Sequence, residues 1–271
     1  MSSDGGQTLT DRAYLTQVQY RTPANLAARQ AVYAFQRPRI DLVGAVLGLA
    51  GLAGTETVAD IGCGNGIYLA ELARRSHAGR LLGADLSPGM LAAARAAAPA
   101  AGLAVADAAR LPLTDGVADV TLAAHMLYHV PDRRAAAAEL RRVTRPGGRA
   151  LVVLNGSGHL AELRELMTST AAAQGLPVEA IGAEYQTYLQ VTLDAGARLL
   201  AGAFGSVQRH DFDAELVLPG VAPVGGYLAS MRSTQAMPDP AGFVAAACAR
   251  IPLGSDGTFR VRTQSGLLIC R

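Results

Sequence analysis

Short apolar runs and longer amphipathic runs alternate along the middle of the chain. Five apolar runs, each of the length of a buried strand, occupy residues 56–62, 80–86, 103–108, 117–124 and 149–155. Between them, apolar positions recur with helical spacing over residues 66–78, 88–98 and 133–144. Ser87 with Pro88, and Asp132, stand where the second and third of these helices begin,. Strand-length runs that alternate with helices predict a parallel sheet covered on both faces.

The segments on either side of this core are mostly helical. Residues 1–50 have helical periodicity and several aromatic side chains, and residues 158–203 are helical with a Gly/Pro break. Residues 206–218 and 258–270 have the pattern of strands, with helices between them. We therefore expect an α/β core with helical additions before it and after its fifth strand. A length of 271 residues fits one domain with an insertion or cap,.

The composition limits the classes of binding partner that we expect. The net charge is only +2, and all 24 basic residues are arginines dispersed along the chain. The densest arginine group, within residues 133–145, has helical spacing and predicts a solvated helix face, so we expect no nucleic-acid partner,. The longest apolar run, residues 42–54, is shorter than the roughly 18 residues of a membrane span,. We expect no membrane partner and interpret this run as a helix packed on the domain.

The cysteines and the N-terminus indicate a reducing compartment. Cys63, Cys248 and Cys270 are far apart, and their spacing gives neither CxxC nor a metal-ligand pattern,. Residues 1–12 are polar and lack the apolar core of a signal peptide,. The sequence thus predicts a cytoplasmic protein with no metal site, and a homodimer stays open as its assembly.

A glycine cluster follows the first apolar run. Gly62, Gly64 and Gly66 form G-x-G-x-G at a strand-to-helix turn, where the backbone can approach a ligand closely,. A Walker phosphate loop needs Lys, and the chain has none,. The dinucleotide fingerprint needs its third glycine at Ile67, although Asp85 stands about where a ribose-binding carboxylate is expected,. A dinucleotide site is therefore an alternative that Ile67 weakens.

The segment "VADIGCGNG", residues 58–66, resembles motif I of the class I S-adenosylmethionine-dependent methyltransferases, in which an acidic residue precedes G-x-G-x-G. Further segments follow in that family's order: "GADLSPGML", "VADAARLPLTDGVADV", "AAHMLYHVPD" and "RPGGRALV". The resemblance is dense over residues 56–155 and is to small-molecule enzymes with a type 11/25-like domain. It implies a Rossmann-like, doubly wound α/β fold with a seven-stranded, mostly parallel sheet. The implied parts are a helical N-terminal lid (1–50), a cofactor-binding core (51–155), a helical cap after strand five (156–205) and C-terminal elements that complete the sheet (206–271).

The resemblance also implies S-adenosylmethionine as the cofactor. Asp60 would accept a hydrogen bond from its ammonium group, Asp85 from the ribose hydroxyls and Asp107 from the adenine amino group. Tyr20 would contact the carboxylate or the sulfonium, and Arg29 would pair with the carboxylate. The remaining expected cofactor contacts are Gly62, Cys63, Gly64, Leu86, Met90, Ala108 and Ala124.

The methyl acceptor is expected beside the end of strand four. His125, Tyr128 and His129 of "HMLYHV" are the candidate catalytic residues, with a structural role as the alternative for each histidine,. A base is needed only if the acceptor must lose a proton. The expected acceptor contacts are Tyr14, Tyr185 and Tyr188. Packing or surface positions are expected for Tyr33, Phe35, His159 and His210.

These features predict methyl transfer to O, N or C of a small molecule. We interpret the arginine-rich, alanine-rich composition as the coding bias of a GC-rich genome and not as a functional signal. A stand-alone cytoplasmic enzyme with a variable cap and such a coding bias is associated with specialised metabolism. The Asn/Asp-Pro-Pro-aromatic motif of nucleic-acid amino methyltransferases is missing after strand four. Two other classes stay open. One is an NAD-dependent oxidoreductase, and the other is a protein that binds S-adenosylmethionine without catalysis.

Overall fold

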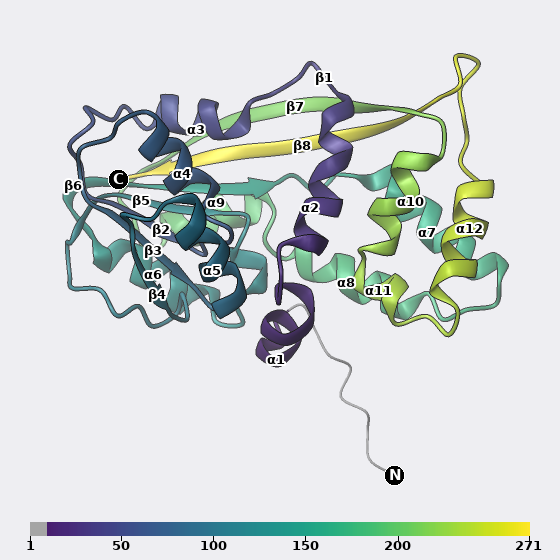
Figure 1. Ribbon diagram of the computed structural model, residues 1–271, viewed down its shortest axis with the longest axis horizontal. Coiled ribbons are helices and arrows are strands. Elements are labelled where there is room, and N and C mark those ends of the chain that lie inside the picture. The colour runs from purple at the N-terminus through teal and green to yellow at the C-terminus, as the bar shows by residue number, and fades with distance from the viewer. Residues whose placement is uncertain (1–9) are drawn as a thin grey trace, which may run out of the picture.

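The computed structural model describes residues 10–271, which form one eight-stranded sheet with helices on both faces (Figure 1). The strand order is β1-β7-β8-β6-β5-β2-β3-β4. Five strands are mutually parallel: β2 (Val58–Ile61), β3 (Leu81–Asp85), β4 (Gly102–Val105), β5 (Ala118–Ala124) and β6 (Thr144–Asn155). β8 (Thr258–Cys270) pairs antiparallel with both β6 and β7 (Val207–Pro219). The predicted α/β fold with a mostly parallel sheet is confirmed.

Successive residues of the buried strands face opposite sides of the sheet. Ala59 and Ile61 of β2 pack with α6 (Arg133–Val143) and α9 (Leu193–Ala201). Val58 packs on the other side with α3 (Leu42–Leu49) and α4 (Ile67–Arg74), and α5 (Pro88–Ala97) lies beside α4. This burial on both faces explains why the strands are nearly continuous apolar runs.

The helices after β3 and β5 begin at the residues that the sequence indicates. Ser87 accepts a hydrogen bond from the backbone N–H of Met90 at 3.2 Å, and Pro88 is the first residue of α5. Asp132 accepts from the N–H of Ala135 at 2.9 Å and caps α6 in the same way. Side-chain caps of this kind satisfy N–H groups that have no partner within the helix.

The sheet has one strand more than the predicted seven. β1 (Gln36–Arg37) pairs antiparallel with β7, Gln36 opposite Leu216 and Arg37 opposite Glu215. A strand of two residues has no hydrophobic period of its own, so the sequence pattern does not indicate it. This short strand covers part of the outer edge of β7,.

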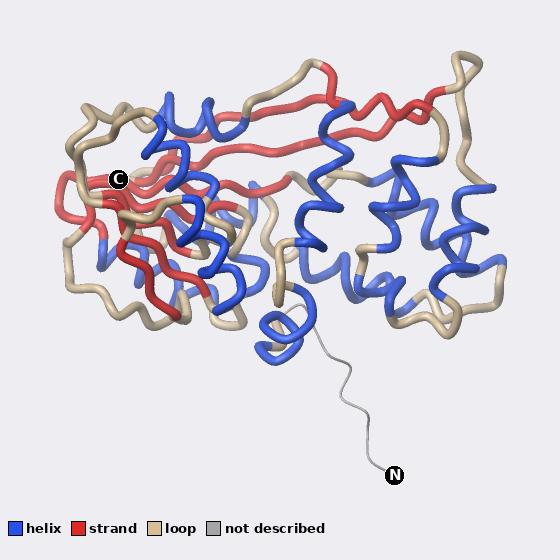
Figure 2. The backbone as a smooth tube through the Cα atoms, in the orientation of Figure 1, coloured by secondary structure: helices blue, strands red, loops and turns tan. Residues whose placement is uncertain are grey.

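A helical cap covers the far ends of β7 and β8, which are 13 residues long and extend past the parallel strands (Figure 2). Leu216 and Phe259 of these far ends are buried there. The cap contains α7 (Ala161–Ala173), α8 (Glu179–Leu189), α10 (Ala222–Ala229), α11 (Arg232–Gln235) and α12 (Pro240–Ala249). The cap therefore contains helices that precede β7 in the chain and helices that follow it, whereas α9 packs on the core. The predicted cap limits of 156–205 do not match this packing. The apolar far ends of β7 and β8 need cover, and helices after residue 220 supply it.

The N-terminal segment lies between the core and the cap (Figure 1). It consists of α1 (Arg12–Tyr14), the π-helix η1 (Leu15–Gln19), α2 (Ala24–Ala31) and the 3₁₀-helix η2 (Val32–Phe35). The Ser87 hydroxyl donates to the carbonyl oxygen of Tyr20 at 2.7 Å and fixes the segment to the start of α5. A Cβ at Gly89 would lie 2.1 Å from the carbonyl oxygen of Arg21, so this contact requires glycine.

Residues 1–9 of the predicted lid, on which the signal-peptide argument depends, lie outside the described residues. Within residues 10–271, every helix is too short or too polar to cross a membrane.

Candidate active site

The loop after β2 lets a ligand approach the backbone closely. In open α/β sheets, ligands bind outside the carboxyl ends of the strands where the strand order reverses, and β2 lies at that point, between β3 and β5,. Gly62, Gly64 and Gly66 have φ angles of +70°, +53° and +78°, a region that residues with a Cβ adopt only at a cost,. A Cβ at Gly62 would also lie 2.6 Å from the Cβ of Met126. The loop therefore needs glycine both for its conformation and for its packing.

Asp85 ends β3 and holds the glycine loop. Its carboxylate accepts from the backbone N–H of Gly64 and from that of Ser87, both at 2.8 Å. Burial raises the pKa of Asp85, and these backbone hydrogen bonds oppose the rise. Each carboxylate oxygen has a second lone pair, so Asp85 can still accept from a ribose diol. Leu86 and Met90 line the cavity beside it.

Asp60, near the end of β2, is the most unusual group of the site. It is only 1% exposed, and its Oδ2 has no hydrogen-bond partner among the described residues. Burial and the neighbouring charge of Asp85 raise its pKa to about 8. A buried acceptor without a partner is costly, so this oxygen suits a donor that arrives with a ligand. The ammonium group of S-adenosylmethionine is such a donor.

Asp107 and Ala108 begin the loop after β4 and line the same cavity. Asp107 accepts from the N–H of Ala109 at 2.9 Å and forms an ion pair with Arg12 of α1. The N-terminal segment therefore reaches the position at which the adenine is expected.

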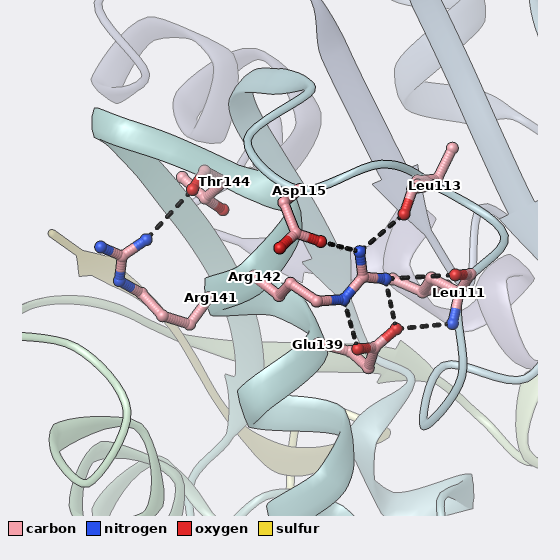
Figure 3. A network of polar contacts seen from close by, with 7 residues as sticks. All are labelled: Leu111, Leu113, Asp115, Glu139, Arg141, Arg142 and Thr144. Atoms are coloured by element: carbon pink, nitrogen blue, oxygen red, sulfur yellow. Dashed lines mark hydrogen bonds and ion pairs between the residues drawn. The ribbon is translucent and has the colours of Figure 1, made fainter.

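Arg142 of α6 holds the rest of that loop (Figure 3). It donates to the carbonyl oxygens of Leu113 at 2.7 Å and Leu111 at 3.2 Å, and it pairs with Glu139 and Asp115. Glu139 in turn accepts from the N–H of Leu111 at 2.7 Å. The Arg142 guanidinium thus fixes the loop after β4 to α6 through two carbonyl oxygens and two carboxylates.

His125 follows β5 directly and has an unusual backbone. Its φ is +52°, and its N–H donates to the carbonyl oxygen of Val153 at 2.9 Å. Residues in this left-handed region are uncommon outside glycine, and strained residues of this kind gather at functional sites. Burial lowers the pKa of His125 to about 4, so its ring is neutral near pH 7. The imidazole lines the cavity next to Ala124, as an uncharged acceptor or donor.

His129, in the 3₁₀-helix η3 (Leu127–His129), meets the N-terminal segment. Its Nε2 lies 2.8 Å from the hydroxyl of Tyr20, and Arg29 donates to the same hydroxyl at 3.4 Å. Because the Tyr20 oxygen accepts from Arg29, its own hydrogen is available to His129. Burial raises the pKa of Tyr20, against the effect of Arg29, so the hydroxyl stays protonated near neutral pH. A continuous hydrogen-bonded chain thus runs from Arg29 to His129.

One cavity of about 820 Å³ joins the glycine loop to the cap. Rings of three tyrosines follow one another toward the cap: Tyr128 and Tyr188 meet edge to face at 4.8 Å between centroids, and Tyr185 lies 6.5 Å from Tyr188. Every predicted cofactor, acceptor and catalytic residue lines this cavity except Tyr14. Tyr14 is instead buried, with its hydroxyl 2.8 Å from the Gln19 amide and Arg232 over its ring, so its position does not support contact with the acceptor.

Two residues that the sequence placed in packing or surface roles also line the cavity. The Nε2 of His159 lies 3.0 Å from the hydroxyl of Tyr33, and its Nδ1 accepts from the N–H of Gln264 at 3.1 Å. Burial and the nearby His125 lower the pKa of His159 to about 3. The ring is therefore neutral with its hydrogen on Nε2, and it donates to Tyr33. No motif marks this pair, since 126 positions separate the two residues.

The strand order, the G-x-G-x-G turn and an acidic residue at the end of the second parallel strand define a Rossmann-like, S-adenosylmethionine-binding protein. The residues present fit that cofactor: Asp60 offers an oxygen without a partner among the described residues, Asp85 lines the cavity with lone pairs that a ribose diol could use, and the loop glycines leave the backbone open,.

Comparison with known proteins supports this assignment. Residues 59–152 match the family model of a methyltransferase domain. The chain is 34% identical over 200 residues to the 23S rRNA (guanine(748)-N(1))-methyltransferase of Streptomyces fradiae, covering 68% of each chain. It is 36% identical over 133 residues to the malonyl-[acyl-carrier protein] O-methyltransferase of Serratia marcescens, covering 49% of this chain and 50% of that one. The chain therefore belongs to the class I S-adenosylmethionine-dependent methyltransferases.

A solved structure supports the fold. Phosphoethanolamine N-methyltransferase 2 of Haemonchus contortus, in complex with S-adenosyl-L-methionine, aligns with a TM-score of 0.60 at 18% identity, over 100% of this chain and 61% of that one. The present chain spans about half the length of the Serratia relative.

Proposed function

We propose that the protein transfers a methyl group from S-adenosylmethionine to a small molecule held between the core and the cap. The observation behind this proposal is the single cavity that contains both the glycine loop and the tyrosine-lined face of the cap. A mostly apolar cavity with a few placed polar groups is typical of small-molecule sites. The relative that modifies malonyl-[acyl-carrier protein] supports an acceptor other than nucleic acid. A role in specialised metabolism stays part of this proposal.

The chain's own residues mainly bind and orient. Asp60 and Asp85 would hold the ammonium group and the ribose, and Asp107 with Ala108 would hold the adenine. When bound, S-adenosylmethionine supplies an electrophilic methyl group. When the acceptor is bound beside that group, the entropy of bringing the two reactants together has already been lost on binding. The chemical step then does not have to include that loss.

His129 and Tyr20 would receive a proton from the acceptor. Tyr20 lines the cavity and its hydroxyl contacts the imidazole, so the pair can take a proton at the phenolic oxygen while passing its own to Nε2. His125 would contact the acceptor as a neutral ring. General base assistance of this kind matters only if the acceptor atom carries a proton that must leave.

The Streptomyces relative supports a second candidate, methylation of a guanine in ribosomal RNA. A flipped base is itself a flat small ring, and a cavity can accept one. Against this candidate, the net charge is only +2, whereas RNA binding depends on phosphate contacts from basic side chains,.

Mass spectrometry can separate these functions. The full chain is incubated with S-adenosylmethionine and either a library of small acceptors or a 23S rRNA transcript. We expect a methylated small product and S-adenosylhomocysteine, and neither with Gly64→Val, which places a β-branched side chain at a φ of +53°. Methylated RNA alone would favour the second candidate. Cofactor binding by calorimetry without any product would favour a binding protein.

A further inference from the structure

Arg29 of α2 brings a half-buried positive charge into the cavity. Its guanidinium donates to the carbonyl oxygen of Ser230 at 3.5 Å and to the hydroxyl of Tyr20 at 3.4 Å. In the amide orientation that satisfies its neighbours, Gln19 also accepts from Arg29,. All three partners are uncharged. Within residues 10–271, no carboxylate oxygen lies within 4.0 Å of the guanidinium nitrogens.

The guanidinium contacts the cap. Ser230 lies between α10 and α11 of the cap, and the side chains that interact with the Arg29 charge include Tyr128, Tyr188 and Tyr227. Burial raises the pKa of each of these tyrosines. Near neutral pH they are therefore uncharged hydroxyls, which cannot balance a cation.

The other charged groups of the region do not neutralise the positive charge of Arg29. Glu184 of the cap is buried and accepts from the N–H of Ser233 at 2.9 Å, and it does not line the cavity. Arg164, which does line the cavity, places a further positive charge 5.5 Å from the ring centre of Tyr185. The carboxylates that line the cavity, Asp41, Asp60, Asp85 and Asp107, belong to the core or to the start of α3. Besides Glu184 and Arg232, the titratable groups around Arg29 include Tyr14, Tyr20, Tyr33, Tyr128, Tyr188, Tyr227 and His129.

We propose that Arg29 binds an oxygen anion of the methyl acceptor, and that the acceptor is a planar molecule with an acidic hydroxyl group, a phenol or an enol. This inference rests on the proposed function and deepens it. An opposite charge in a site of low dielectric favours the ionised hydroxyl and opposes a protonated amine. The tyrosine rings that meet edge to face offer flat walls that suit a planar ring,. Arg29 thus contacts the acceptor rather than the cofactor carboxylate to which the sequence assigned it.

Ionisation of the hydroxyl prepares the transfer. The acceptor proton goes to the Tyr20 oxygen as the Tyr20 hydrogen moves to Nε2 of His129, and the negative charge left on the acceptor oxygen faces Arg29. One electron pair of that oxygen then forms the new C–O bond. The C–S bond of the donor breaks in the same step, and its electron pair stays on sulfur. The products are a methyl ether and a thioether, with the extra proton on the His129 imidazole.

The test uses 4-nitrophenol, because its anion absorbs differently from its neutral form. The full chain, saturated with S-adenosylhomocysteine, is titrated with the probe one pH unit below the probe's own pKa. We expect the absorbance of the anion to rise on binding. Arg29→Gln should weaken this binding by about 10- to 100-fold, the range for a hydrogen bond to a charged group. Arg29→Lys should keep most of it, since the charge is kept.

Two controls make the outcomes distinct. Arg232→Gln removes an arginine that lies over the ring of Tyr14 and does not line the cavity, so it should bind the probe as the wild type does. Calorimetry with S-adenosylhomocysteine should give the same affinity for Arg29→Gln as for the wild type, which also shows that the variant is folded. If Arg29→Gln lost cofactor affinity but left the ionisation of the probe unchanged, Arg29 would be assigned to the cofactor carboxylate and the proposal would be overturned. Tighter binding of 4-nitrobenzylamine than of 4-nitrophenol, or no binding of the phenol anion, would also overturn it. If the wild type bound no cofactor, the proposed function itself would fail.

Discussion

Substituting Asp60 tests whether the oxygen without a partner is the ammonium site. Its pKa of about 8 means that roughly nine tenths of the carboxyl groups are protonated at pH 7 in the ligand-free protein,. An ammonium group at Oδ2 stabilises the carboxylate, so binding of S-adenosylmethionine at pH 7 should release a proton from Asp60. Affinity should then rise by up to about tenfold per pH unit from pH 6 to pH 8, and level off above that range. Asp60→Asn has nearly the same shape and no proton to release.

Calorimetry at pH 7 in two buffers of different ionisation enthalpy measures this proton. The cofactor's own titration contributes equally to wild type and Asp60→Asn, so the difference between them isolates Asp60. We expect the wild type to release close to one proton more than the variant. Equal proton counts, together with equal pH dependence of affinity, would refute the placement of the ammonium group at Asp60.

The same group should make the stability of the ligand-free protein depend on pH. Its folded-state pKa of about 8 lies above the ordinary aspartate pKa of 3.8, so its stabilising contribution is complete below pH 4 and is lost as pH rises through 8,. Over this window the loss is about 1.4 kcal/mol per pH unit at most. Denaturant unfolding at several pH values should show a flatter profile for Asp60→Asn than for the wild type. A parallel profile would mean that Asp60 is not protonated in the folded protein.

Three further substitutions probe other parts of the site. Asp85→Ala should weaken cofactor affinity by roughly 1–3 kcal/mol in calorimetry, the cost of a lost charged hydrogen bond, and unchanged affinity would remove Asp85 from the ribose site. Arg142→Ala should lower the free energy of unfolding by about 1–2 kcal/mol, because two loop carbonyls lose their charged donor,; Arg141→Ala, which removes a bond to Thr144 at 3.1 Å, is its control, and equal losses would refute a special role for Arg142. His125→Asn tolerates the φ of +52° and should reduce turnover more than cofactor affinity, whereas full turnover would assign His125 a structural role,.

The cofactor half of the site could be predicted from local sequence. Gly62 and Asp107 follow parallel strands and Asp85 ends one. The carboxyl ends of neighbouring parallel strands meet at one edge of a sheet,. Once the strands are recognised, their order along the chain brings these residues together. Capping residues such as Ser87 indicated where the helices begin, because a cap bonds to a backbone group within three residues.

The acceptor half depends on contacts across the chain. Tyr20 meets His129 over 109 positions, and Arg29 meets Ser230 over 201. The two-residue strand β1 and the division of the cap helices between two insertions likewise depend on where β7 and β8 pack in the folded sheet, which the pattern of those strands does not show. His159 received a packing or surface role for the same reason, since its partner Tyr33 lies on another element.

What the sequence determined by itself is therefore the sheet, the glycine loop and the carboxylates that follow the strands, because each depends on residues close in the chain. The tertiary structure alone decided which tyrosines and histidines share the cavity and that the charge of Arg29 faces the cap. The physical reason is that a side chain's partners, and the burial that shifts its pKa, are set by elements that meet only when the chain has folded.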